Sequence, residues 1–289
     1  MSDEPFVTHR GLLFTVAYEM LGSAADAEDV VQETWLRWAN TDQAAVRDPR
    51  AFLVRVVTRQ ALNRLRTLAR QREDYVGAWL PEPLLTSPDV AEDVELAESV
   101  SIAMLTVLET LGPVERAVFV LREVFDVPYD EIAEAVGKSS ATVRQIAHRA
   151  RRHVARRRPR MAVSRTEQQQ VVQRFLAALT TGNVQGLMDV LAPDVVMVAD
   201  SGGVVPAARH PVVGRERAVA LLARFAQLAP GTEVAPLLLN GAVAARIDPA
   251  GELDTVVTFV VEDARISRIY AIRNPAKLGR LEKVAELRR

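Results

Sequence analysis

The first half of the chain alternates helical patterns of apolar residues with short polar breaks. Apolar side chains recur at helical spacing in five segments, namely 6–21, 24–39, 49–72, 94–111 and 113–125. Gly22 and Ser23 supply a stop and a cap between the first two segments. Pro49 suits the first turn of the third segment, because that position needs no hydrogen-bonded N–H. The pattern predicts an N-terminal half made of helices.

Residues 129–152, YDEIAEAVGKSSATVRQIAHRARR, have the pattern of a helix-turn-helix. Ile132 and Ala133 lie on the apolar face of a first helix, and Gly137 stands where the tight turn needs a positive φ. Apolar residues return at helical spacing in the second helix. Its outward side chains are basic or polar, namely Ser139, Ser140, Thr142, Arg144, Gln145, His148, Arg149 and Arg152. Such a helix can enter a major groove and reach base edges and phosphates.

After residue 165 the pattern changes to helices followed by strands. Two helical stretches come first, and a further helix, 215–228, lies between the first two strands. The predicted strands are residues 195–199, 234–239, 242–247, 254–262 and 265–273. Helices followed by a meander of strands indicate an α+β domain.

Charge divides the N-terminal half into blocks. Residues 50–72 hold seven arginines and no acid, 81–110 hold seven acids and no base, and 138–160 are again basic without an acid. The formal net charge of −1 hides this asymmetry. Two basic blocks around an acidic one suggest two nucleic-acid-facing modules on a tether. Three prolines between positions 81 and 88 place that tether at residues 77–95.

Composition narrows the classes of protein further. The chain lacks cysteine, which excludes disulfides and thiolate metal sites and makes a reducing cytoplasm the natural setting. Its four histidines have no spacing typical of a metal site, so neither a metal nor another cofactor is expected. The N-terminus has no apolar signal core, and no apolar run approaches the length of a membrane span. We therefore expect a cytoplasmic protein without a membrane partner.

Two segments of the helical half carry a family resemblance. DAEDVVQETWLRW, residues 26–38, resembles the sigma region-2 helix that docks on the clamp helices of the β′ subunit of bacterial RNA polymerase. Residues 111–151 resemble sigma region 4, which reads the −35 promoter element. Because both segments occur in this order and spacing, residues 6–158 are identified as similar to a sigma factor of the extracytoplasmic-function type.

Shorter motifs resemble those of a subgroup with a C-terminal SnoaL-like domain. They are WLPEPL at 79–84 and, only partly kept, DSGGV at 200–204 and NPAKL at 274–278. The resemblance implies a multidomain protein with two all-α sigma modules, the region 2 helical bundle and the region 4 helix-turn-helix, followed by an α+β domain with the cone-shaped sheet of SnoaL and nuclear-transport-factor-2 proteins. The implied segments are 1–76 for region 2, 77–95 for the acidic linker, 96–160 for region 4 and 165–289 for the regulatory SnoaL-like domain.

The resemblance also implies roles for individual residues. The eight outward residues of the second helix of the helix-turn-helix would read the −35 element. Helix 49–72 and the loop before it would hold the −10 element, with a flipped base in the loop, through Arg47, Arg50, Arg59, Asn63, Arg64 and Arg66. Core polymerase would contact Asp26, Glu28, Asp29, Gln32, Glu33 and Trp35. The regulatory positions would be Trp79, Pro81, Glu82, Pro83, Asp200, Gly202, Gly203, Asn274, Pro275 and Lys277, with Trp79 in an interdomain contact.

The function implied is that of an alternative sigma factor without catalytic chemistry of its own. It would bind core RNA polymerase through the β and β′ subunits and direct initiation at promoter DNA in the nucleoid. The C-terminal domain would tune this activity within the same chain. Whether that domain also binds an unknown small ligand is left open.

Three features have alternative interpretations. The chain would instead be a ligand-responsive helix-turn-helix regulator if it bound an operator without core polymerase. The C-terminal domain would be an enzyme if Asp194, Asp200 and His210 served as acid and base, although no spacing connects them. The acidic linker is a solvated tether, or follows the polymerase toward the active-site and RNA-exit channel, or screens the basic modules.

Overall fold

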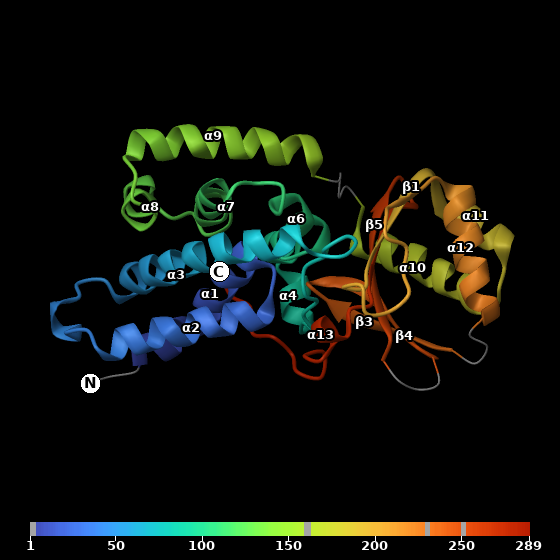
Figure 1. The fold of residues 1–289 in the computed structure, drawn as a ribbon, viewed down its shortest axis with the longest axis horizontal. Coiled ribbons are helices and arrows are strands. Elements are labelled where there is room, and N and C mark those ends of the chain that lie inside the picture. The colour runs from blue at the N-terminus through green and yellow to red at the C-terminus, as the bar shows by residue number, and fades with distance from the viewer. Residues whose placement is uncertain (1–3, 159–162, 229–231, 250–252) are drawn as a thin grey trace.

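The computed structural model describes residues 4–158, 163–228, 232–249 and 253–289, and Figure 1 shows the course of the chain. The N-terminal half contains α1 (Glu4–Leu21), α2 (Ala24–Ala39), the 3-10 turn η1 (Gln43–Ala45), α3 (Pro49–Glu73), α4 (Pro88–Glu92), α5 (Val94–Ser99), α6 (Ile102–Leu108), α7 (Pro113–Phe119), the π-helical turn η2 (Val120–Val124), α8 (Tyr129–Val136) and α9 (Ser140–Arg157). The predicted end of region 4 at residue 160 lies outside the described residues.

The C-terminal half combines a sheet with covering helices. Its elements are α10 (Arg165–Thr180), α11 (Val184–Val190), β1 (Leu191–Asp200), β2 (Val212–Val213), α12 (Arg215–Leu228), β3 (Glu233–Leu239), β4 (Ala242–Asp248), β5 (Thr255–Glu262), β6 (Arg265–Ile272) and α13 (Pro275–Leu278). The fold class of helical modules followed by an α+β domain is therefore confirmed.

α1 is the central helix of the N-terminal half. It contacts both α2 and α3, and the backbone N–H of Arg288 in the C-terminal tail donates to Thr15 on α1 (3.0 Å). Every residue from Gly11 to Leu21 is buried. The second half of α1 is therefore covered on all sides, so the single apolar face predicted for residues 6–21 is too narrow there.

The helix-turn-helix forms as the sequence predicts. Gly137 between α8 and α9 adopts the left-handed conformation with φ 67°. Ser139 caps α9, because its hydroxyl accepts a hydrogen bond from the N–H of Thr142 (3.2 Å). The buried side chains of α9, from Val143 to Val154, face α7 and α8. The opposite side of α9 is left for solvent.

The sheet separates two environments in the C-terminal domain. Its six strands have the order β2-β1-β6-β5-β4-β3, with β1 parallel to β6 and the other neighbouring pairs antiparallel. All five predicted strands are present, and β2 is an addition. One face packs against α10, α11 and α12 (Figure 1). The other face packs against the linker, α6 and α13.

The segment between the two sigma-like modules is more ordered than its prolines predict. Pro88 begins α4 instead of interrupting structure, because the first turn of a helix needs no N–H from that residue. The single helix predicted for 94–111 is divided into α5 and α6. The division falls at Ser101, whose hydroxyl accepts from the N–H of Met104 (3.1 Å) and so starts a new helix.

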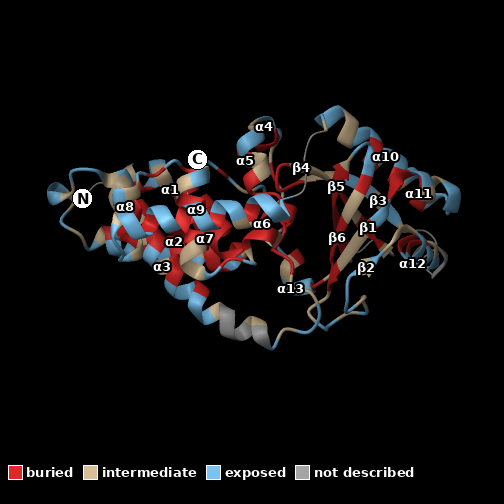
Figure 2. Cartoon of the chain, turned by 90° about the horizontal axis from the view of Figure 1, so that it is seen from above, coloured by how far each residue is buried: buried red, intermediate tan, exposed pale blue. Residues whose placement is uncertain are grey.

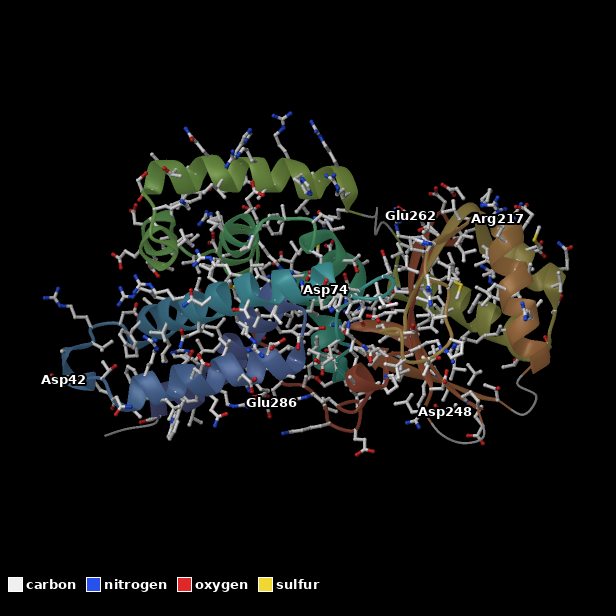
Figure 3. All side chains as sticks on the ribbon, in the orientation of Figure 1. Asp42, Asp74, Arg217, Asp248, Glu262 and Glu286 are labelled. Atoms are coloured by element: carbon white, nitrogen blue, oxygen red, sulfur yellow. The ribbon has the colours of Figure 1, made fainter. Side chains whose placement is uncertain are left out.

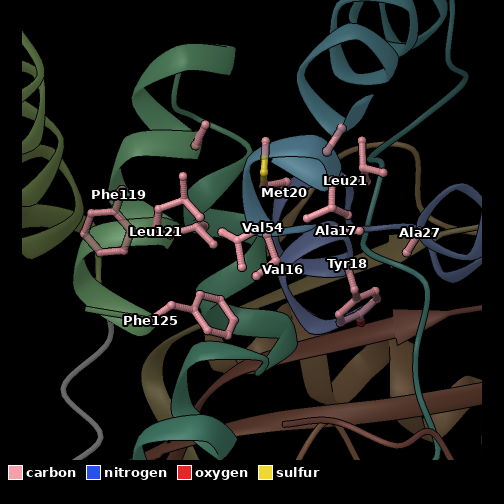
Figure 4. Close-up of a cluster of buried hydrophobic side chains, with 14 of the residues drawn as sticks. Val16, Ala17, Tyr18, Met20, Leu21, Ala27, Val54, Phe119, Leu121 and Phe125 are labelled. Atoms are coloured by element: carbon pink, nitrogen blue, oxygen red, sulfur yellow. The ribbon is translucent and has the colours of Figure 1, made fainter. Parts of the chain in front are cut away.

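The helices of the N-terminal half share one hydrophobic core, and the expectation of two modules on a free tether is wrong for this arrangement. Figure 4 shows Val16 and Met20 of α1 and Val54 of α3 near Leu121 and Phe125, which follow α7. In Figure 2 the buried residues, drawn in red, lie on the sides of the helices that face neighbouring helices. Burying one such side chain stabilises the folded state by about 1.5–3 kcal/mol, which favours packing over separation.

Candidate nucleic-acid interface

The outer face of α9 presents the residues predicted to read the −35 element. Ser140 is half-buried and donates a hydrogen bond to Asp130, so it is partly withdrawn from this face. The exposed members are Ser139, Thr142, Arg144, Gln145, His148, Arg149 and Arg152. α9 lies at the edge of the molecule, and its long side chains extend away from the fold (Figure 3). The arrangement suits insertion of α9 into a major groove.

Two arginines of α9 already have partners within the fold. Arg151 donates to both carboxylate oxygens of Glu123 (2.9 and 2.7 Å), and these bonds raise the pKa of its guanidinium. A phosphate would have to compete with that carboxylate. Arg144 lies over the ring of Tyr129, with 5.5 Å between the guanidinium carbon and the ring centre, which restricts its orientation without pairing its charge.

The residues predicted to hold the −10 element do not form one open surface. Four members are exposed, namely Arg47, Arg50, Asn63 and Arg66, and Arg66 donates to Asn63 on the same helix (3.4 Å). Arg59 donates to the carbonyl oxygens of Glu134 (2.7 Å) and Ala135 (3.4 Å), at the C-terminal end of α8, where the helix dipole favours a cation. Arg55 also pairs with Glu134 (2.7 Å). The helix-turn-helix therefore covers part of the predicted −10 surface.

Arg64, predicted to hold the −10 element, is bonded to Asp26, which was predicted to contact the polymerase. It donates to Asp26 on α2 (2.6 Å), and this hydrogen bond raises the Arg64 pKa. Asp26 is itself buried, and Glu28 pairs with Arg10 (2.7 Å). Asp29 also lies 3.9 Å from Arg64, and Glu33 accepts from Gln60 (2.8 Å), so all four acids predicted to meet the polymerase have a partner within the chain.

Three of the other predicted polymerase contacts line an open groove between α2 and α3. The groove has a volume of about 450 Å³, and its walls include Asp29, Gln32, Glu33, Asn63 and Arg64. On α2, Trp35 is 37% exposed, whereas Trp38 is buried against Phe52. An exposed aromatic residue beside acids suits contact with a basic protein surface.

The WLPEPL segment lies between the helical half and the C-terminal domain. Pro81, Glu82 and Pro83 are buried. The Glu82 carboxylate accepts from the N–H of Ala24 (2.8 Å) and so caps α2, and the Glu82 carbonyl accepts from the hydroxyl of Tyr18 (2.7 Å). The interpretation of this segment as a solvated tether is wrong.

Acids that follow this segment pair with arginines of the other modules. Glu109 binds Arg72 of α3 and Arg116 of α7, and Glu98 binds Arg158 after α9. Asp93 pairs with the last residue of the tail, Arg289 (3.2 Å). These ion pairs favour the interpretation that the acidic segment screens basic charge.

The two partly kept C-terminal motifs meet the linker in what we call the Asp200 cluster, made of Tyr75, Trp79, Leu80, Asp200, Asn274 and Lys277. Asp200 is fully buried and accepts from Lys277 Nζ (2.6 Å), from the N–H of Leu80 (2.8 Å) and from the hydroxyl of Tyr75 (2.5 Å). Burial lowers the pKa of Lys277, although Asp200 acts in the opposite direction. The cluster ties β1 and α13 to the linker.

Trp79 makes the interdomain contact that the sequence predicts. Its ring centre is 4.1 Å from Lys277 Nζ of the C-terminal domain and 3.8 Å from the guanidinium carbon of Arg72 on α3. A Cβ added at Gly22 would lie 2.7 Å from the same ring. Trp79 is therefore held between the first module and the last.

The glycines of the DSGGV motif permit close approach. A Cβ at Gly202 would lie 2.5 Å from Asn274 Nδ2, and Gly203 has a φ of 74°. Asn274 caps α13, whose first residue is Pro275, and donates to the hydroxyl of Tyr75 (2.8 Å). Gly202 and Asn274 thus pack together beside Tyr75 of the Asp200 cluster, whereas Gly203 lies against Val76.

Asn240, which sequence reasoning missed, connects three modules. It lies in the β3–β4 turn with a φ of 52°. Its amide oxygen accepts from the N–H of Leu84 (2.9 Å), and its amide nitrogen donates to the Tyr18 hydroxyl (2.7 Å) and the Val100 carbonyl (2.8 Å). The only local signal is the Asn-Gly pair at 240–241, which predicts a hairpin turn and no distant contact.

Replacing Asn240 with glycine is expected to loosen the packing between the modules. Glycine keeps the positive φ but leaves the partners of the side chain unpaired, at a cost on the order of 3 kcal/mol. Hydrogen exchange of the Leu84 amide should accelerate by about a hundredfold. Asp263→Gly, in the exposed β5–β6 turn with a φ of 50°, is the matched control. Equal effects of the two changes would contradict the role of the Asn240 side chain.

A buried acid, Glu19, was also missed. It lies on α1, fully buried, and its carboxylate accepts from the hydroxyl of Ser99 on α5 (2.8 Å). Burial raises the pKa of Glu19 to about 8, although the Ser99 hydrogen bond and the Arg116 charge act against this. A carboxyl in this state is mostly protonated at neutral pH.

The residues considered for catalysis do not come together. Asp194 and His210 are exposed, and Asp200 belongs to the Asp200 cluster. Within the described ranges, no group of three or more His, Asp or Glu residues is placed to hold a metal ion. None of the helices among these residues is long and apolar enough to cross a membrane.

Comparison with protein families defines the class of the chain. Residues 6–71 match Sigma-70 region 2, residues 101–154 match Sigma-70 region 4, and residues 172–269 match a SnoaL-like domain. Together with the exposed basic face of α9, these matches define a sigma factor that carries an additional C-terminal domain.

Similar proteins specify the family. The chain is 37% identical to the ECF RNA polymerase sigma factor SigJ of Mycobacterium tuberculosis, over 96% of this chain and 93% of that protein. It is 33% identical to the probable ECF RNA polymerase sigma factor SigI of the same organism, over 94% and 93%. The crystal structure of M. tuberculosis SigJ superposes with a TM-score of 0.78 at 34% identity, covering 97% of this chain and 99% of that one. This chain belongs to the extracytoplasmic function (ECF) RNA polymerase sigma factors, which are transcription initiation factors and not enzymes.

Proposed function

We propose that this protein is an alternative sigma factor that directs core RNA polymerase to promoters whose −35 element is read by α9. The observation that carries the proposal is the exposed, basic and acid-free face of α9, a helix that follows the turn at Gly137 and is capped by Ser139. Arginine and glutamine on that face can pair with guanine and adenine edges, and the remaining cations can bind phosphates. The protein would act in the cytoplasm, at the nucleoid.

The proposal that the chain is a sigma factor also indicates which polymerase subunits it contacts. The acids and Trp35 beside the groove between α2 and α3 would meet the β′ subunit, and region 4 would meet the β subunit. The exposed acids on α2 support this, because they complement a basic partner.

We also propose that the C-terminal domain keeps the factor closed. The positions that name the −35 and −10 elements differ by about 25 base pairs, which is about 85 Å along a duplex at about 3.4 Å per base pair. Arg59 on the predicted −10 surface is bonded to α8 of the helix-turn-helix, so the two surfaces cannot reach both elements in this arrangement. The modules must separate on the promoter, and the contacts of Asn240 and of the Asp200 cluster oppose that separation.

Run-off transcription with purified core polymerase, on DNA upstream of the protein's own gene, tests the first proposal. Arg149→Ala should lower the transcript by about tenfold, because one base or phosphate contact contributes about 1–3 kcal/mol. Arg217→Ala is the matched control, since Arg217 is exposed on α12 in the other domain (Figure 3). No transcript from the native protein, together with failure to co-purify with core polymerase, would overturn the proposal.

The same assay tests the closed arrangement. Asn240→Gly should increase the transcript from the full chain, because it weakens the contacts that hold the modules together while leaving α9 intact. Asp263→Gly should leave the transcript unchanged. A decrease with Asn240→Gly would indicate that the C-terminal domain supports initiation instead of opposing it.

A further inference from the structure

The C-terminal domain contains a cavity of about 470 Å³ between the sheet and its covering helices. Its walls are mostly apolar and include Phe175 of α10, Leu222 of α12, Met197 of β1 and Val257 of β5. A cavity of this volume with apolar walls and few polar groups has the properties of a site for a small organic molecule.

Arg273 supplies the main polar group of the cavity wall, and its charge is already compensated. The guanidinium donates to both carboxylate oxygens of Asp254 (2.9 and 2.8 Å) and to the hydroxyl of Thr255 (3.1 Å). The other charged lining residue, Arg224, is exposed to solvent. Because the charge of Arg273 is compensated and Arg224 is solvated, an anion would lose its hydration in this cavity for little electrostatic gain, so a neutral ligand is favoured.

Strand alternation connects the cavity to the Asp200 cluster. Successive side chains of a strand face opposite sides of the sheet. Ala199 lines the cavity, and the next residue, Asp200, binds the linker. Arg273, the residue directly after β6, also lines the cavity, and the next residue, Asn274, binds Tyr75. A molecule in the cavity would therefore contact the immediate neighbours of two residues that hold the linker.

The loop after β1 provides a second connection. Ala207 in this loop lines the cavity, and the carbonyl of Pro206 accepts a hydrogen bond from Arg273. At its start, the same loop places Gly202 against Asn274. Movement of the loop around a ligand would therefore be transmitted to the Asp200 cluster.

We propose that this cavity binds a neutral, mainly apolar small molecule and that its occupancy changes how tightly the Asp200 cluster holds the linker. The effect on transcription rests on the proposed sigma activity. Binding and the response of the linker are properties of the free protein, so they are measured without polymerase or DNA. Failure of the sigma proposal would leave both measurements unaffected.

Binding is tested on the full chain with N-phenylnaphthylamine, a neutral apolar fluorophore. Anilinonaphthalene sulfonate has the same aromatic framework with an added anionic group, so the pair isolates the effect of charge. The neutral probe should bind in one copy per chain and more tightly than the anionic probe by about tenfold or more. Absence of saturable binding, or tighter binding of the anionic probe, would overturn the proposal.

Cavity-filling variants test the location of the bound probe. Ala207→Phe, from the loop, and Leu222→Phe, from α12, should each weaken binding of the neutral probe by about tenfold, because the added ring occupies its space. Ala220→Phe, on the exposed side of α12, is the matched control and should not alter binding. Unchanged binding in both cavity variants would place the probe elsewhere and overturn the site.

The response of the linker is measured as hydrogen exchange of the Leu80 amide, which donates to Asp200. Saturation with the neutral probe should change its exchange rate by about threefold or more in the native protein and in Ala220→Phe. The change should be lost in Ala207→Phe at the same probe concentration. Binding that leaves Leu80 exchange unchanged would overturn the coupling to the linker.

Discussion

Replacing Lys277 with methionine is expected to open the contact between the C-terminal domain and the linker. The ammonium of Lys277 compensates Asp200, which is fully buried. Methionine has a similar length without a charge, so it would leave a buried carboxylate without its cation. Removing one partner of a buried ion pair costs about 3–5 kcal/mol. Hydrogen exchange of the Leu80 amide should accelerate by at least about a hundredfold.

Two further variants isolate the electrostatic cause. Lys283→Met changes an exposed lysine of the same C-terminal segment and should leave Leu80 exchange unchanged. Adding Asp200→Asn to Lys277→Met removes the uncompensated charge and should restore part of the protection. If the double variant exchanged as fast as Lys277→Met, the effect would have to come from lost packing around Trp79 instead of lost charge.

The stability of the helical half is expected to fall as pH rises from about 5 to 8, because of Glu19. Burial raises its pKa from 4.5 in the unfolded chain to about 8 in the folded protein. Between these values the folded state keeps the proton and the unfolded state has lost it. The free energy of unfolding therefore decreases by about 1.4 kcal/mol per pH unit from this group and levels off above its folded pKa.

Urea unfolding of Glu19→Gln at several pH values measures this contribution. Glutamine has the same shape and stays neutral, so the slope from this position should disappear. The stability difference between the variant and the native protein should grow by about 1.4 kcal/mol per unit from pH 5 to 8. Glu286→Gln, an exposed acid of the C-terminal tail (Figure 3), is the control and should keep the native slope. A constant difference between Glu19→Gln and the native protein at every pH would show that Glu19 is ionised in the fold.

Loss of stability of the helical half at high pH would act in the same direction as loss of Lys277. Glu19 joins α1 to α5 through Ser99, and the Asp200 cluster joins the linker to the C-terminal domain. Both contacts hold together modules that, in the proposal of a closed factor, separate to span a promoter. Run-off transcription should therefore increase with Lys277→Met, as it does in our expectation for Asn240→Gly.

Local features of the sequence predicted the elements well where the signal is itself local. Gly137 and Ser139 mark the turn and cap of the helix-turn-helix, since each acts on its own backbone or on an N–H three residues away. The prediction of one helix over 94–111 was wrong, because the hydroxyl of Ser101 starts a new helix within an apolar run.

The partners of charged side chains were much harder to predict. Arg59 and Arg64 are typical nucleic-acid ligands by residue type, yet they bind α8 and Asp26 within the fold. A surface that reads DNA and a surface that packs against an acidic neighbour have the same composition. The sequence therefore indicates a basic surface without indicating what covers it.

Most of the helices and strands, the basic outer face of α9 and the sigma-factor motifs follow from the sequence alone, because periodicity, capping and motif spacing act over a few residues. Which of these surfaces are covered by other modules depends on the tertiary structure. Asn240 meets Tyr18 across 222 positions and Asp200 meets Lys277 across 77, although neither pair has a local pattern. Such contacts exist because the apolar faces of separate modules pack together and bring distant polar groups within hydrogen-bonding reach, where burial makes an unpaired group costly.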